Sequence, residues 1–138
     1  MKTRKPKATT YEQVHDNHAM VQRVEEGLPV MEVVQFGKQA GFTNDELARL
    51  INIPARTYAR RVADKARLKM HEGERAARLM RVFERAKRLL GNAQNTREWF
   101  NLELPALGWR TPLDFAQTEP GAREVEAVIE RLEDGVVM

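Results

Sequence analysis

Apolar residues recur at helical spacing along most of this chain. Residues 11–26 and 30–40 each carry apolar side chains three or four positions apart, and each segment is followed by a glycine that can end a helix. A longer stretch, about residues 71–90, repeats the pattern and ends before Gly91. We find no segment with the alternation of a half-buried strand and no internal repeat. The pattern predicts an all-α fold.

Two shorter helices are expected between these segments. The sequence TNDE at residues 43–46 has the form of a capping box, in which Thr43 and Glu46 each bind the backbone N–H of the other. After a helix and a turn of about two residues, Pro54 begins a second helix, PARTYARRVA. Two short helices joined by so short a turn are typical of a helix-turn-helix.

The last part of the chain has a different pattern, in which proline and glycine interrupt the apolar positions from about Asn95 onward. Thr111 can cap a short helix with Pro112 in its first position. The sequence EPG is expected to break that helix. Residues 122–134 then predict an amphipathic helix that Gly135 ends.

Charge divides the 138 residues more sharply than the net charge of +3 suggests. Residues 1–54 carry seven basic and seven acidic side chains. Residues 55–90 carry twelve basic and four acidic ones, a net charge of +8, and residues 91–138 carry four basic and nine acidic ones, a net charge of −5. The asymmetry indicates a polyanionic partner for the middle of the chain and a different partner for its end.

Several classes of protein are disfavoured. The chain has no cysteine or serine and no glycine-rich phosphate loop, so we expect no enzyme and no cofactor. His15 and His18 lie three residues apart, but this spacing arises often by chance, and we expect no metal site. No apolar run approaches the roughly 18 residues of a membrane span, and no secretory leader is recognised, so a cytoplasmic location is expected.

The basic helix is the candidate DNA-binding element. A helix-turn-helix places the start of its second helix in the major groove, where arginine can bind guanine with two hydrogen bonds. The predicted DNA-binding residues are Thr43, Ala55, Arg56, Thr57, Arg60, Arg61, Lys65, Arg67 and Lys69. The alternative is a solvated basic face. Tyr58 is expected in the core, and the basic residues of the long helix are left open between solvation and pairing with acids elsewhere.

Several of these segments together resemble a known family. ARTYARR, Glu74 to Arg78, Trp99, LGWRTPLD, Thr118 to Gly121 and RLEDG occur in the order and spacing of the MbcA/ParS/Xre antitoxins, over about residues 36–135. The resemblance implies an Xre-like helix-turn-helix bundle followed by a small helical toxin-binding domain. It also implies a RES-domain toxin that consumes NAD or transfers from it, an NAD pocket blocked by the C-terminal region, and repression of the antitoxin's own operon.

The chain departs from the family at Trp109, where a glycine is usual, and residues 1–35 carry no motif that we match. The predicted toxin-binding residues are Trp109, Arg110, Arg131, Gly135, Val136, Val137 and Met138, and the alternative for the last three is a frayed terminus. An acidic end would complement a basic NAD site. The predicted domains are a basic arm at residues 1–10, a DNA-binding and dimerisation domain at 11–91, and a toxin-binding domain at 92–138. The alternative function is a stand-alone, homodimeric transcription regulator without a toxin partner.

Overall fold

The computed structural model describes residues 11–135, and it describes side chains from residue 17 onward. The predicted arm at residues 1–10 and the tail at 136–138 lie outside the described residues. The elements are α1 (Tyr11–Glu26), α2 (Val30–Ala40), α3 (Asn44–Leu50), α4 (Ala55–Ala63), α5 (Met70–Leu90), α6 (Ala93–Phe100), the 3-10 helix η1 (Pro105–Leu107), α7 (Pro112–Phe115) and α8 (Glu119–Glu133). The predicted all-α fold is confirmed.

Local signals in the sequence set most helix ends. Thr43 and Glu46 form the predicted capping box at the start of α3, with N···O distances of 3.0 and 3.1 Å. Thr111 caps α7 as predicted, and Pro112 takes its first position. The prediction for α8 was wrong at its start, because Thr118 caps a helix that begins at Glu119 and includes the EPG sequence. Proline is compatible with this position, because the backbone N–H that it lacks would have no partner in the first turn of a helix.

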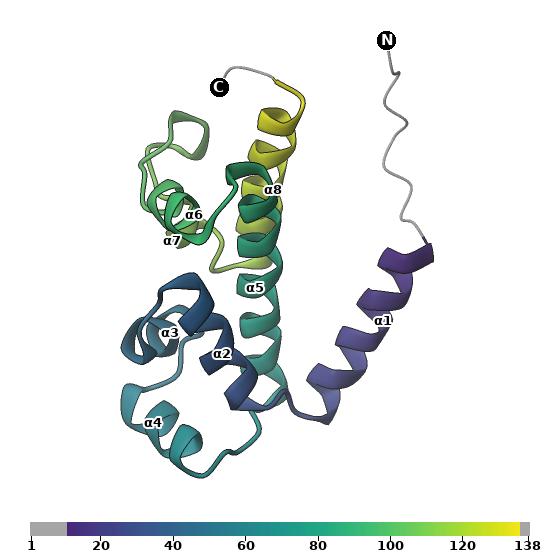
Figure 1. Ribbon diagram of the computed structural model, residues 1–138, viewed down its shortest axis with the longest axis vertical. Coiled ribbons are helices and arrows are strands. Elements are labelled where there is room, and N and C mark those ends of the chain that lie inside the picture. The colour runs from purple at the N-terminus through teal and green to yellow at the C-terminus, as the bar shows by residue number, and fades with distance from the viewer. Residues whose placement is uncertain (1–10, 136–138) are drawn as a thin grey trace.

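The helix α5 joins the two halves of the molecule. Figure 1 shows α5 and α8 side by side along the long axis, with the bundle of α2, α3 and α4 beside the lower half of α5. The C-terminal end of α1 meets α5, and the rest of α1 diverges from α5, so the two helices form a V (Figure 1). The helix α5 therefore packs against parts of the chain on both sides of residue 91, and the predicted domain boundary there stays a prediction.

A line of aromatic rings makes the two halves share one core. Phe83 of α5 packs edge-on against Phe36 of α2 at a centroid distance of 5.4 Å, and it contacts Phe42 at 5.5 Å. On its other side Phe83 stacks with Phe100 of α6 at 5.6 Å. Aromatic pairs in this geometry contribute about 0.5–1.5 kcal/mol beyond the burial of their area. The two modules that composition separates are thus one packed unit.

Candidate functional sites

The turn between α3 and α4 is held from behind by α5. Asn52, in the turn, adopts a left-handed backbone with a φ of 56°. The Arg75 Nε atom donates to the Ile51 carbonyl at 2.7 Å, and its Nη2 atom donates to the Asn52 carbonyl at 3.3 Å. Arg75, which the sequence left open, therefore orients the helix-turn-helix from within the chain and is not a free surface cation.

The predicted DNA-binding residues fall into two groups. Arg56 and Arg60 are exposed along α4, with Thr57 half-buried between them. Besides Arg67, which is exposed but hydrogen-bonded within the chain, the exposed members that remain are Thr43, Ala55, Lys65 and Lys69. The last two precede α5, so the exposed cations extend beyond the end of α4. This group presents a basic surface on and beside the second helix of the helix-turn-helix.

Arg61 and Arg67 have partners inside the chain. The Arg61 guanidinium forms a largely buried ion pair with Glu72, which also accepts a hydrogen bond from the Lys69 backbone N–H at 2.9 Å. Arg67 donates from Nη1 to the Gly27 carbonyl at 2.7 Å and so connects the segment between α4 and α5 to the link between α1 and α2. Both arginines were predicted as DNA contacts, and that stays a prediction, but in this structure their guanidinium groups already have partners within the chain. We leave them out of the basic surface.

Tyr58 lies on the inner side of α4, as predicted. Its side chain is 1% exposed and its hydroxyl has no hydrogen-bond partner among the described residues. Burial disfavours the phenolate and raises the pKa of Tyr58 to about 12. The ring therefore supports α4 from the core and is not available to stack on a base.

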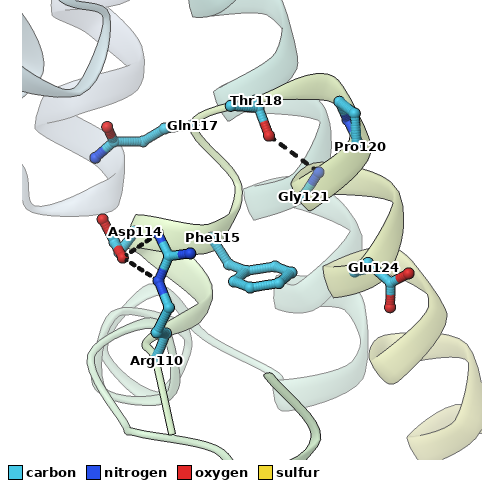
Figure 2. Close-up of a pocket in the computed structure, with 8 residues that line it drawn as sticks. All are labelled: Arg110, Asp114, Phe115, Gln117, Thr118, Pro120, Gly121 and Glu124. Atoms are coloured by element: carbon cyan, nitrogen blue, oxygen red, sulfur yellow. Dashed lines mark hydrogen bonds and ion pairs between the residues drawn. The ribbon is translucent and has the colours of Figure 1, made fainter. Parts of the chain in front are cut away.

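The second site is the corner between α7 and α8. Thr118 accepts a hydrogen bond from the Gly121 N–H at 3.1 Å, which fixes the first turn of α8. An open groove of about 400 Å³ follows this corner, and Figure 2 shows the Phe115 ring between the Arg110 guanidinium and α8. The groove is lined by Arg110, Asp114, Phe115, Gln117, Thr118, Pro120, Gly121 and Glu124. Arg110 was predicted from the sequence. The groove was not, because the walls of the groove come from two helices.

Arg110 is held in place at the mouth of this groove. Its Nε and Nη2 atoms bind the same carboxylate oxygen of Asp114 at 2.8 and 2.7 Å, and its guanidinium carbon lies 5.0 Å from the centre of the Phe115 ring. A cation over an aromatic face is attracted by the electron density of the ring. These contacts fix the end of the loop that connects α6 to α7.

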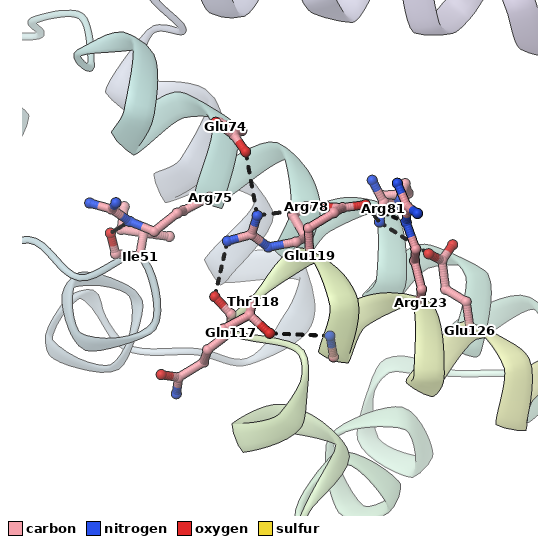
Figure 3. A network of polar contacts seen from close by, with 11 residues as sticks. Ile51, Glu74, Arg75, Arg78, Arg81, Gln117, Thr118, Glu119, Arg123 and Glu126 are labelled. Carbon is pink, nitrogen blue, oxygen red and sulfur yellow. Dashed lines mark hydrogen bonds and ion pairs between the residues drawn. The ribbon is translucent and has the colours of Figure 1, made fainter.

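Arginines of α5 pair with glutamates of α8. Arg81 contacts Glu119 at 3.1 Å and Glu126 at 3.0 Å, and Arg85 contacts Glu133 at 3.4 Å (Figure 3 shows the Arg81 end). The sequence interpretation took the acidity of the C-terminal module as complementary to a cationic partner. Three of its glutamates contact α5 and so form part of the interface between the two halves, and the complementarity of the module to a cationic partner stays a prediction.

Arg78 is the buried centre of that interface. Its side chain is 8% exposed, and its Nη2 atom donates to the Gln117 carbonyl at 3.0 Å. Its Nη1 atom lies 3.6 Å from carboxylate oxygens of both Glu74 and Glu119 (Figure 3). Because Gln117 forms the corner between α7 and α8, Arg78 fixes the second site to α5.

The other predicted toxin contacts lie on exposed segments. Trp109 is 66% exposed at the tip of the loop between α6 and α7. Arg131 is exposed in the last turn of α8, and Gly135 follows that helix with a φ of 76°. Val136, Val137 and Met138 lie outside the described residues. In Figure 1 this loop and the C-terminal end of α8 lie toward one end of the long axis, whereas α4 lies toward the other.

Comparisons with known proteins cover both halves of the chain. Residues 19–81 match a family model described as the antitoxin Xre-like helix-turn-helix domain, and residues 85–135 match the antitoxin Xre/MbcA/ParS C-terminal toxin-binding domain. A Photorhabdus laumondii protein named Antitoxin Xre is 34% identical over 113 residues, which is 81% of this chain and 76% of that protein. A Yersinia enterocolitica protein of the same name is 33% identical over 118 residues, 85% of this chain and 80% of that protein.

Fold, surfaces and comparisons together define a helix-turn-helix protein with a toxin-binding domain. The chain belongs to the Xre antitoxin family. The match supports an antitoxin of a toxin-antitoxin system, a class that is generally not enzymatic. None of the helices in the described part of the chain is long and apolar enough to cross a membrane.

Proposed function

We propose that this antitoxin neutralises a RES-domain toxin by blocking the active site of that toxin with its C-terminal end, and that it represses its own operon through α4. The proposal rests on the placement of the two surfaces toward opposite ends of the long axis (Figure 1). The helix α5 between them has 21 residues, which corresponds to about 30 Å at the usual rise per residue. Toxin and DNA can therefore bind to the same chain at the same time.

The C-terminal end of α8 supports the blocking role. The left-handed backbone at Gly135 redirects the chain as it leaves the helix, and a Cβ atom added at this position would meet no atom within 4 Å. The three residues beyond it are apolar. A short apolar segment after such a turn is suited to enter a cleft of a partner, and we assign the inhibitory contact to residues 136–138.

Removal of residues 136–138 is expected to abolish neutralisation. Co-expression of the shortened chain with the product of the adjacent toxin gene should then arrest growth, whereas the full chain should permit it. The shortened chain should still shift operator DNA, because the helix-turn-helix lies far from the tail. Full protection by the shortened chain would rule out the tail as the inhibitory element. A full chain that binds operator DNA but never protects would instead indicate a stand-alone regulator.

The DNA-binding role is tested at the two exposed arginines of α4. Each guanine contact by arginine contributes about 1–3 kcal/mol, so the double substitution Arg56→Gln and Arg60→Gln should weaken operator binding by about 30-fold or more. Electrophoretic mobility shifts with the operator measure this loss. The matched control is Arg88→Gln with Arg123→Gln, which removes the same charge from exposed positions away from α4. Equal effects of the two pairs would contradict the assignment of α4 as the recognition helix.

We further propose that the repressor is a homodimer, since helix-turn-helix proteins usually bind paired half-sites about one DNA turn apart. The operator is then expected to contain an inverted repeat. Sedimentation of the free chain tests the oligomeric state.

A further inference from the structure

The tip of the loop between α6 and α7 has an unusual backbone. Gly108 and Trp109 are both left-handed, with φ values of 65° and 64°. Among the described residues only Asn52, Lys65 and Trp109 are left-handed without being glycine. For a residue with a Cβ this conformation costs roughly 1–2 kcal/mol, and bulky side chains seldom adopt it. The chain therefore places its largest type of side chain where glycine would be less strained.

Several hydrogen bonds impose this conformation on the tip. The Trp109 N–H donates to the Leu104 carbonyl at 2.9 Å, and the Leu104 N–H donates to the Arg110 carbonyl at 3.1 Å. The buried Leu107 side chain anchors the loop from within, and Arg110 is clamped by Asp114. Strained residues persist where the surrounding structure determines them in this way, and such residues cluster at functional sites.

The strain is not offset by burial of the indole. Trp109 is 66% exposed, the largest exposed fraction among the large apolar side chains of the described residues. Leu102, on the same loop, is 52% exposed. Elsewhere in the described chain, the other tryptophan, Trp99, packs against the Phe100 ring at 5.3 Å. Contact of the exposed indole with a second molecule would offset the strain of the backbone that carries it.

We infer that Trp109 is the aromatic anchor by which this antitoxin holds its toxin, separate from the tail that blocks the active site. The inference rests on the proposed function, and it assigns affinity and partner choice to the loop and inhibition to residues 136–138. The toxin surface that fits is an apolar cleft wide enough for an indole, with a carbonyl or carboxylate oxygen to accept its N–H. Hydrogen bonds already hold the backbone of the loop in this conformation in the free chain, so less backbone entropy is lost when the complex forms.

The position of the loop supports this occupant. Trp109 lies inside the segment that matches the toxin-binding domain and directly precedes Arg110 at the mouth of the groove. Tryptophan is enriched among the few residues that carry most of the binding energy of an interface. A second copy of this chain is the other candidate occupant, and the experiment separates the two.

The test substitutes Trp109→Asn in the full-length chain, since asparagine tolerates a left-handed backbone. Leu102→Asn is the matched control, because it removes an exposed apolar side chain from the same loop without touching the left-handed pair. Affinity for the purified product of the adjacent toxin gene is measured by calorimetry, and the melting temperature of each free chain by circular dichroism. Trp109→Asn should weaken toxin binding by about 30-fold or more and leave the melting temperature unchanged or raised. Leu102→Asn should change the affinity less than fivefold.

Fluorescence provides a second readout of the same contact. On addition of the toxin, the emission of the wild-type chain should shift to shorter wavelength as the exposed indole becomes buried, and the shift should be absent in Trp109→Asn. The chain without residues 136–138 should retain most of its affinity and the same shift, although it no longer inhibits.

The outcomes distinguish the two proposals. If the wild-type chain does not bind the toxin, the proposed function fails and the anchor fails with it. Unchanged affinity in Trp109→Asn overturns the anchor alone. A lowered melting temperature would show that the indole stabilises the free chain, which also overturns the anchor. If the substitution dissociates a dimer of the free chain while the toxin affinity stays the same, the occupant is a second copy, and the inference is again overturned.

Discussion

Replacement of Gly121 by alanine is expected to disrupt the corner between α7 and α8. A Cβ atom at this position would lie 1.7 Å from the Phe115 carbonyl oxygen and 2.9 Å from its carbonyl carbon. Both atoms belong to the backbone, so no change of rotamer relieves the clash, and α8 must move away from α7. Overpacking usually costs 1–3 kcal/mol, and a collision with rigid backbone places this substitution at about 3 kcal/mol or more. Chemical denaturation of the free chain measures the loss.

Gly73→Ala is the matched control for this experiment. Gly73 is also a buried glycine inside a helix, but a Cβ there would lie 3.4 Å from the Leu28 Cβ atom and 3.7 Å from a methyl group of Val24. These are ordinary contacts, and alanine favours a helix over glycine by about 1 kcal/mol. Gly73→Ala should therefore leave the stability unchanged or raise it. Equal destabilisation by the two substitutions would contradict the role of Gly121.

Loss of the Arg78 guanidinium is the second large effect that we expect. Arg78→Met should leave the Gln117 carbonyl without its donor and remove the charge that faces Glu74 and Glu119. The two carboxylates remain accessible to water, so most of the cost comes from the lost hydrogen bond between the charged guanidinium and the Gln117 carbonyl. We expect a decrease of about 2–3 kcal/mol in the free energy of unfolding, measured with urea. Toxin affinity should fall as well, because the corner loses its link to α5.

Two further variants define what Arg78 contributes. Arg78→Lys keeps the charge but cannot direct separate nitrogen atoms to Gln117 and to the carboxylates, so it should restore only part of the stability. Arg123→Ala removes an arginine that is 77% exposed and lies 3.7 Å from Glu119. An exposed pair of this kind contributes little, and this variant should stay within about 0.5 kcal/mol of the wild type. If Arg78→Met lowered the free energy of unfolding no more than Arg123→Ala does, the contacts of Arg78 would contribute nothing measurable to stability.

Local patterns in the sequence were sufficient for most of the helices. The capping box at Thr43, the cap at Thr111 and the glycine stops involve residues within about four positions of one another, and the chain forms them as written. The core position of Tyr58 followed from the same periodicity. The start of α8 was misplaced because Pro120 was taken as a break, although a proline in the first turn is compatible with a helix.

The candidate sites depended on contacts that the sequence does not display. The composition showed a basic helix and an acidic end, but whether those charges face solvent, DNA, a toxin or one another depends on which helices pack together. Arg61 pairs with Glu72, eleven positions away, and Arg81 pairs with Glu126, forty-five positions away. Such pairs form only when α5 packs against α4 and α8.

The sequence by itself predicted the helix-turn-helix from local periodicity and caps, and the resemblance carried by its motifs predicted the family, which the comparisons confirm. Only the tertiary structure decided which cations of the basic segment, such as Arg61 and Arg67, have partners within the chain. It alone showed that three glutamates of the C-terminal module pair with arginines of α5. It also showed that Trp109 has a left-handed backbone and an exposed indole. Neither property can be deduced from the sequence, because both depend on how the loop folds around Leu107.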